Sequence, residues 1–223
     1  MTSFKVVHGE ISLQAHFLVP LFDLLDPPAS RVHSALYSDL SEFGISLNDV
    51  KLVYGVPNLA EVSVSYYLLN LNALVKLSLD RLEITFSETT QLSHDQMIAV
   101  YKKTFHSLGQ MATGFKVREY NVTLALHGLL EDKSTVEFWK DLVPKVPMGL
   151  GPTSGQGVVF YHGAHDKIAS SSVVLDTSVR VPNGIFFRTT VNLDGAKLST
   201  DDLPGFVEKT FDTVSSNLDM TLT

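Results

Sequence analysis

A stretch of fourteen residues near the middle of the chain recurs near its end. Residues 92–105 read LSHDQMIAVYKKTF, and residues 198–211 read LSTDDLPGFVEKTF. Six positions are identical at one constant offset of 106 residues. Self-similarity at a fixed spacing indicates a duplicated structural unit. The alternative is that two amphipathic helices with ordinary N-terminal caps have converged in composition.

Two further pairs of blocks keep the same order along the chain. The segment EISLQAHFLV resembles the segment NVTLALHGLL, which places His16 against His127 at an offset of 111 residues. Residues 52–58 line up more loosely with residues 160–166, at an offset of 108. The small drift in offset is what short loop deletions produce. Together the three pairs favour a tandem duplication.

The blocks predict a repeating unit of one strand, one helix, three or four strands and a closing helix. The first strand of each unit alternates apolar and polar residues, as a half-buried strand does. The closing segments combine an N-terminal serine cap with apolar residues at helical spacing. We expect an α+β fold, a tandem duplication of a β-α-β(3-4)-α unit that forms one curved, mostly antiparallel sheet with helices on one face. Residues 1–223 then make a single pseudo-symmetric domain with repeat halves at about 1–115 and 116–223.

Local signals predict several element boundaries. An aspartate and two prolines at 26–28 precede a helical pattern that Gly44 ends. Ser134 begins a capping box and therefore a second helix. Residues 72–86 read as a strand whose alternation slips near its middle, which indicates either a bulged strand or two strands joined by a tight turn.

In element order alone, this unit resembles the repeat whose tandem copies form the saddle of TATA-box-binding proteins. It also resembles the helix-grip folds that hold apolar ligands. Neither family's sequence motifs are present. The chain carries 24 acidic against 17 basic residues, a net charge of −7, which repels a phosphate backbone. We therefore expect no nucleic-acid partner.

Composition excludes several classes of protein. The chain contains no cysteine, which rules out disulfides, thiolate nucleophiles and cysteine-ligated metal or iron–sulfur sites. No apolar stretch is long enough for a membrane span, and the first residues lack the pattern of a secretory signal. We expect a soluble, cytoplasmic protein without a membrane partner. The sequence leaves open whether the chain forms a homo-oligomer.

Patterns that carry chemistry are sparse. His162, His165 and Asp166 have side chains that bind metals, but they would need a further ligand from elsewhere in the chain, and an ordinary turn explains them as well. The chain has no GxSxG nucleophile elbow. We therefore expect no metal and no cofactor, and we assign no catalytic residue.

Strand alternation predicts a set of polar and charged side chains on the sheet face turned away from the helices. A concave or covered face would be the binding surface, whereas an open face would be a polar surface without a function. The arginines would meet an anionic group, and either histidine would make binding depend on pH. The candidate ligand-binding residues are His16, His127, Tyr67, Arg180 and Arg188.

The sequence favours a non-enzymatic binding or interaction module. It would hold an unknown small molecule or protein on the sheet face or in the groove between the repeats. The alternative is a small enzyme that acts through His, Asp and Arg side chains in the same place. A strongly shifted titrating pair in a deep pocket would favour the enzyme.

Overall fold

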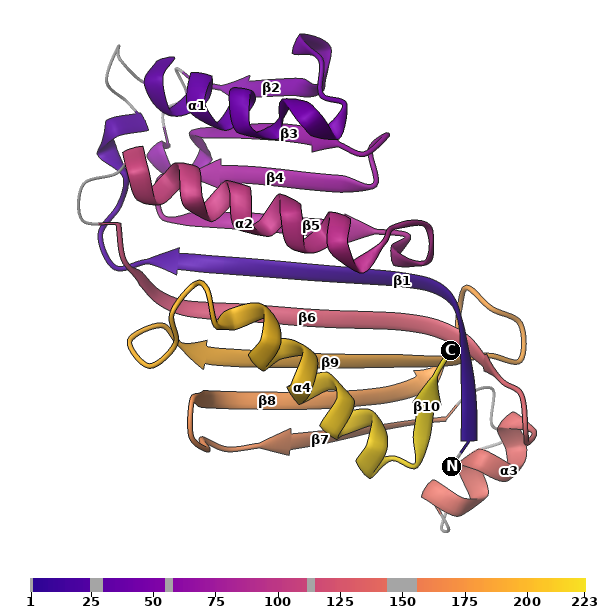
Figure 1. Cartoon of the computed structure of the whole chain (residues 1–223). Helices are drawn as coiled ribbons and strands as arrows, with labels where there is room; N and C mark the ends of the chain where they lie inside the picture. Colours follow the sequence, from indigo (N-terminus) through magenta and orange to yellow (C-terminus); the bar gives the residue numbers. More distant parts are fainter. Residues whose placement is uncertain (1, 25–29, 55–57, 112–114, 144–155) are drawn as a thin grey trace.

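The computed structural model describes residues 2–24, 30–54, 58–111, 115–143 and 156–223, and within them one broad sheet carries helices on one face (Figure 1). The expected α+β class is confirmed. The ten strands of the described sheet are β1 Thr2–Phe17, β2 Val50–Val53, β3 Ser63–Leu68, β4 Ala73–Ser78, β5 Arg81–Ser87, β6 Val117–Leu130, β7 Gly157–His162, β8 Ile168–Thr177, β9 Ile185–Asp194 and β10 Met220–Leu222. The α-helices of the same ranges are α1 Ser30–Leu40, α2 His94–Met111, α3 Thr135–Leu142 and α4 Leu203–Asn217.

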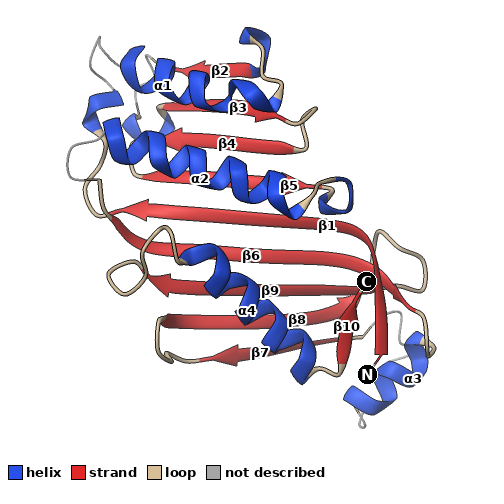
Figure 2. Ribbon diagram, viewed as in Figure 1, coloured by secondary structure: helices blue, strands red, loops and turns tan. Residues whose placement is uncertain are grey.

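The two longest strands, β1 and β6, lie side by side at the centre of the sheet (Figure 2). Across the sheet the strands follow the order β2-β3-β4-β5-β1-β6-β9-β8-β7, and each neighbouring pair is antiparallel. The short strand β10 runs parallel to the start of β1. Each flank of the sheet is therefore built from one continuous part of the chain, and β1 and β6 join the two parts.

Alternation along β1 places its apolar side chains under the helices, as expected. Leu13, Ala15 and Phe17 are buried, whereas Ser12 and His16 lie on the opposite face and are partly exposed. Helix α1 contributes Leu36 and Leu40 to the same core. Because side chains alternate with a period of two, a half-buried strand can keep this pattern in only one register.

Several predicted boundaries are confirmed. The segment 72–86 forms two strands, β4 and β5, rather than one bulged strand. Ser134 and Glu137 form a capping box at the start of α3. Gly44 follows a short 3-10 turn after α1 and has a φ of 78°, in the left-handed region that glycine tolerates. The predicted start signal at 26–28 lies outside the described residues.

The loose match between residues 52–58 and 160–166 is wrong as a structural equivalence. β2 is the fourth strand out from the centre on its side, beyond β5, β4 and β3, whereas β7 is the third on the other side, beyond β9 and β8. Both segments start at the end of a short edge strand and contain a glycine, which is enough to produce so loose a match. Residues 55–57 lie outside the described part of the chain.

Within the described part of the chain, no helix is both long and apolar enough to cross a membrane.

Candidate functional site

A groove lies between α2 and α4, above the two central strands of the sheet. Helix α2 covers β5 and α4 crosses β6 and β9, which leaves a strip of the sheet between them (Figure 1). The groove has a volume of about 260 Å³. Its floor is formed by Ile11 and Leu13 of β1 and by Val122 and Leu124 of β6. Both parts of the chain therefore contribute to it.

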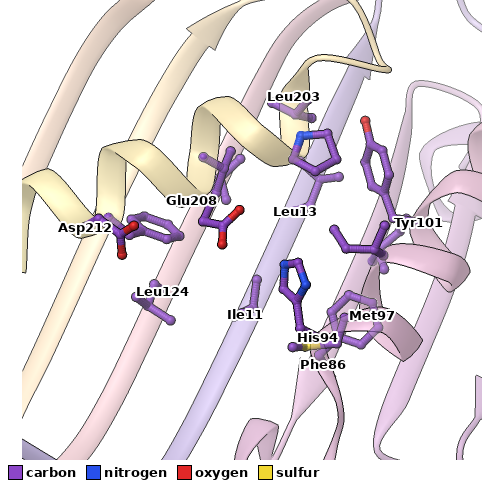
Figure 3. Close-up of a pocket in the computed structure, with 16 residues that line it drawn as sticks. Ile11, Leu13, Phe86, His94, Met97, Tyr101, Leu124, Leu203, Glu208 and Asp212 are labelled. Carbon is purple, nitrogen blue, oxygen red and sulfur yellow. The ribbon is translucent and has the colours of Figure 1, made fainter. Parts of the chain in front are cut away.

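The walls of the groove are also apolar. Figure 3 shows Met97 and Tyr101 of α2 facing Leu203 of α4 across the floor. Residues spaced three or four apart share one helix face, so each helix presents a short apolar stripe to the groove. Besides the four floor residues of β1 and β6, the apolar residues that line the groove are Ile84 and Phe86 of β5, Met97, Ile98 and Tyr101 of α2, and Leu203, Pro204, Val207 and Phe211 of α4.

Tyr101 ties the two sides of the groove together. Its hydroxyl donates a hydrogen bond of 2.6 Å to the carbonyl oxygen of Thr200, just before α4. Burial raises the pKa of Tyr101 well above that of a free tyrosine, with smaller contributions from Tyr120 and Asp201. The phenol is therefore neutral and acts as a structural contact.

The rim of the groove carries acidic groups. Glu208 and Asp212 lie one turn apart on α4, and His94 of α2 lies across from them (Figure 3). All three side chains are exposed. Among the described residues that line the groove, none is lysine or arginine. An apolar floor with an acidic rim can accept an apolar group that carries a positive charge, and it repels an anion.

Three of the five predicted site residues gather at one end of the opposite sheet face. His127 packs on Phe186 with ring centroids 4.7 Å apart, and its Nδ1 lies 2.8 Å from Oγ of Ser178. The guanidinium of Arg188 lies 6.0 Å from the centre of the Phe186 ring. Burial, with the charges of Arg180 and His8, lowers the pKa of His127.

The other two predicted residues lie elsewhere. His16 is at the opposite end of β1, paired with Glu119 of β6, whereas His127 is paired with His8. Eight residues of strand separate His8 from His16, roughly 26 Å at about 3.3 Å per residue. Tyr67 lies on β3, with Nζ of Lys51 4.6 Å from its ring centre. The five residues therefore do not line one pocket.

The predicted place of Arg180 on a strand is wrong. β8 ends at Thr177, and Arg180 lies in the connection to β9. The hydroxyl of Ser178 accepts hydrogen bonds from the backbone N–H groups of Arg180 and Val181, at 3.2 and 2.9 Å. Such local bonds compete with strand pairing. They turn the chain away from the sheet before Arg180.

His165 lies in the exposed turn between β7 and β8, as the turn interpretation expects, whereas His162 is the last residue of strand β7 and is paired with Ser171. His165 forms an isolated bridge with Ile168, and Asp166 between them has a φ of 52°. Within the described ranges, no three or more His, Asp or Glu side chains converge in a way that could hold a metal ion.

A second polar cluster lies beneath α1. The ring of His33 has Nδ1 3.3 Å from the hydroxyl of Tyr66, and its Nε2 is hydrogen-bonded to the hydroxyl of Tyr54. Burial lowers the pKa of His33 and raises the pKa of both tyrosines. A neutral imidazole can satisfy both hydroxyls, because one nitrogen donates and the other accepts.

Folding stability should therefore fall as the solution becomes acidic. A histidine whose pKa is lower in the folded state binds protons preferentially when the chain is unfolded, so its stability contribution is lost as pH falls below about 6.5. We expect urea unfolding at about pH 5.5 to give a smaller free energy than at about pH 7.5. The His33→Gln variant should show a smaller difference between the two pH values. An equal difference in wild type and variant would contradict the role of His33.

The sequence predicts a groove between the halves, but it does not predict which residues line that groove. The apolar spacing on α2 predicts only a packing stripe, and nothing in it shows that part of the stripe stays uncovered. The pair Glu208 and Asp212 was the available sequence signal for the residues of the groove. Two like charges one turn apart destabilise a helix slightly, so such a pair is unfavourable for the helix itself.

Known proteins identify neither a family nor a function for this chain. No protein-family model matches the chain, and no curated protein matches it. Among solved structures, the rolling circle replication initiator protein from Geobacillus stearothermophilus is 10% identical, with a TM-score of 0.31 over 87% of this chain and 76% of that one. A likeness this weak carries no argument about function.

Proposed function

We propose that the protein is a non-enzymatic binding module that holds a small apolar ligand with a cationic end in the groove between α2 and α4. The observation that carries the proposal is the combination of an apolar floor with an acidic rim. Ligand pockets are typically lined by apolar side chains with a few polar groups that fix orientation. Here Glu208 and Asp212 supply those polar groups.

The apolar part of the ligand would cover side chains that now contact water. Ile11, Met97 and Ile98 line the groove and are only partly buried. Covering apolar surface is worth about 25 cal/mol for each Å² removed from water. The groove volume of about 260 Å³ suits a short alkyl chain or a single ring.

The state of Tyr101 favours a binding module over an enzyme. Its hydroxyl is engaged with the carbonyl oxygen of Thr200 at 2.6 Å. A buried phenol whose proton is already donated to a backbone carbonyl is held as a structural contact.

We further propose that the halves at about 1–115 and 116–223 are copies of one unit, related by a pseudo-two-fold axis between β1 and β6. The order strand, helix, strands, helix occurs in both halves. The strand register supports this axis. Residues that are paired on neighbouring strands form a row from β3 to β7, and the residue types along this row are similar when it is read from either end. The row is Tyr67, Leu74, Thr85, Ser12, Thr123, Thr190, Ser172 and Tyr161.

This arrangement supports the resemblance in topology to the saddle of TATA-box-binding proteins and to helix-grip folds. The proposed axis exchanges α2 with α4, so the groove lies at the junction of the two copies. A junction between two copied units is a natural place for a ligand site, since neither unit alone encloses it.

Titration with octylamine and octanoate tests the proposed function. The two ligands share an alkyl tail and differ in the sign of the head group. We expect octylamine to shift the amide NMR signals of residues around the groove and to bind at least about tenfold more tightly than octanoate, equivalent to about 1.4 kcal/mol.

Charge variants make the test specific. The double variant Glu208→Gln/Asp212→Asn should lose the preference for the amine. The double variant Glu83→Gln/Glu119→Gln removes the same charge from the opposite sheet face and should keep it, because both glutamates lie on strand positions that face away from the groove. Equal binding of both ligands to the wild type would refute the proposal, as would shifts confined to the opposite face.

A further inference from the structure

Strand β7, the outer strand at one edge of the sheet, has an unusual sequence for its position. In the described part of the chain it pairs with β8 alone. Its sequence, GVVFYH, contains no lysine, acidic residue or proline. Exposed edge strands normally carry such residues, because unpaired backbone groups invite pairing with another chain. The opposite edge strand, β2, does carry Lys51.

The side chains of β7 are apolar and accessible on both faces. Val159 is 46% exposed and Tyr161 is 82% exposed, and both lie on the face turned away from α4. Phe160 is 39% exposed and lies on the helix-covered face. A strand that leaves apolar groups in water on both faces gains from a neighbour on its free edge, whichever face that neighbour extends.

The hydrogen-bond pattern shows which backbone groups point outward. The carbonyl oxygen of Gln156 accepts from the N–H of Thr177, directly opposite on β8, at 3.0 Å. Hydrogen-bonded pairs alternate along an antiparallel ladder. The N–H and C=O groups of Gly157, Val159 and Tyr161 therefore point away from β8, toward the free edge.

We propose that β7 pairs with β7 of a second copy of this chain, antiparallel about a two-fold axis at Val159. The side chains of two directly opposed residues lie on the same face of a sheet. The two-fold axis must therefore place one residue opposite the same residue of the other copy, and not opposite its neighbour in sequence. With the axis at Val159, each outward-pointing residue faces another: Val159 faces its own copy, and Gly157 faces Tyr161. The two sheets become one.

The side chains also fit this register. The ring of Tyr161 lies beside Gly157 of the other copy, and an aromatic ring covering a glycine on a neighbouring strand stabilises a sheet. The two Val159 side chains meet on the same face. No charged side chain of β7 opposes one of like sign, because the strand carries none apart from its terminal His162. These features favour a second copy over an unrelated strand.

Cysteine cross-linking gives a specific test, because the wild-type chain contains no cysteine. The Cα atoms of a hydrogen-bonded antiparallel pair lie about 5.5 Å apart, a distance that a disulfide can span. We expect Val159→Cys to form a covalent dimer under mild oxidation. Val53→Cys, on the opposite edge strand and 39% exposed, should stay mostly unlinked.

Sedimentation of the untreated protein completes the test. The wild type should have twice the mass of one chain, Val159→Lys should have the mass of one chain, and Val53→Lys should remain a dimer. Circular dichroism checks that each variant is folded. A wild type with the mass of a single chain would overturn the proposal and leave the edge to a strand from another protein. A dimer unaffected by Val159→Lys would overturn it too.

Discussion

Replacing Phe105 or Phe211 with alanine should lower the free energy of unfolding of the whole chain by about 3–5 kcal/mol, in one cooperative transition. Phe105 of α2 is 6% exposed and Phe211 of α4 is 8% exposed. The ring centroid of Phe105 lies 4.7 Å from that of Tyr101 on the same helix and 6.4 Å from that of Tyr120 on β6. A helix of the first half therefore packs on a strand of the second.

Urea unfolding followed by both tryptophan fluorescence and circular dichroism measures this effect. Lys102→Ala, an exposed change on the same helix, is the control and should change stability by less than about 0.5 kcal/mol. If the halves were independent, each phenylalanine variant would shift only one of two transitions. Residues 1–115 alone should fail to fold, because β1 would lose its pairing with β6.

Gly128→Ala should destabilise the protein by roughly 3 kcal/mol or more, through a clash that local adjustment cannot relieve. A Cβ at this position of β6 would lie 2.3 Å from the carbonyl oxygen of Lys5 and 2.8 Å from Cζ of Phe4. Phe4 is fully buried, and β1 is held in place here by its pairing with β6. The backbone can make room only by breaking that pairing.

Gly109→Ala is the matched control for this substitution. Gly109 lies in α2, and an added Cβ there meets no atom within 4 Å. Because alanine favours a helix more than glycine does, this variant should gain about 0.5–1 kcal/mol. Urea midpoints compare the two variants. A Gly128→Ala protein as stable as the wild type would show that the β1–β6 junction is looser than the structure has it.

Local sequence patterns predicted the elements well because their physical causes are local. The two-residue period of a half-buried strand assigned Leu13 to the core and His16 to the other face. The serine cap of α3 and the glycine after α1 act within a few residues of the helix ends. The order of strands is different, since it depends on pairing between distant segments. The wrong match of residues 52–58 shows this limit.

The candidate site was less predictable for a related reason. A groove depends on how far apart two helices lie on the sheet, and that distance is set by side chains from several elements at once. Met97 and Tyr101 have the spacing of ordinary core residues, so their spacing alone does not distinguish them from the core. Arg180 was misplaced because the hydroxyl of Ser178 ends strand β8 early.

The most direct test of the central claim, that the groove between α2 and α4 binds an apolar cation, is a crystal structure of the protein with octylamine. The alkyl chain should lie over Ile11 and Leu124, with its ammonium group within about 3 Å of a carboxylate oxygen of Glu208 or Asp212. Octylamine bound beside His127 and Arg188 on the opposite sheet face, with the groove empty, would contradict the claim.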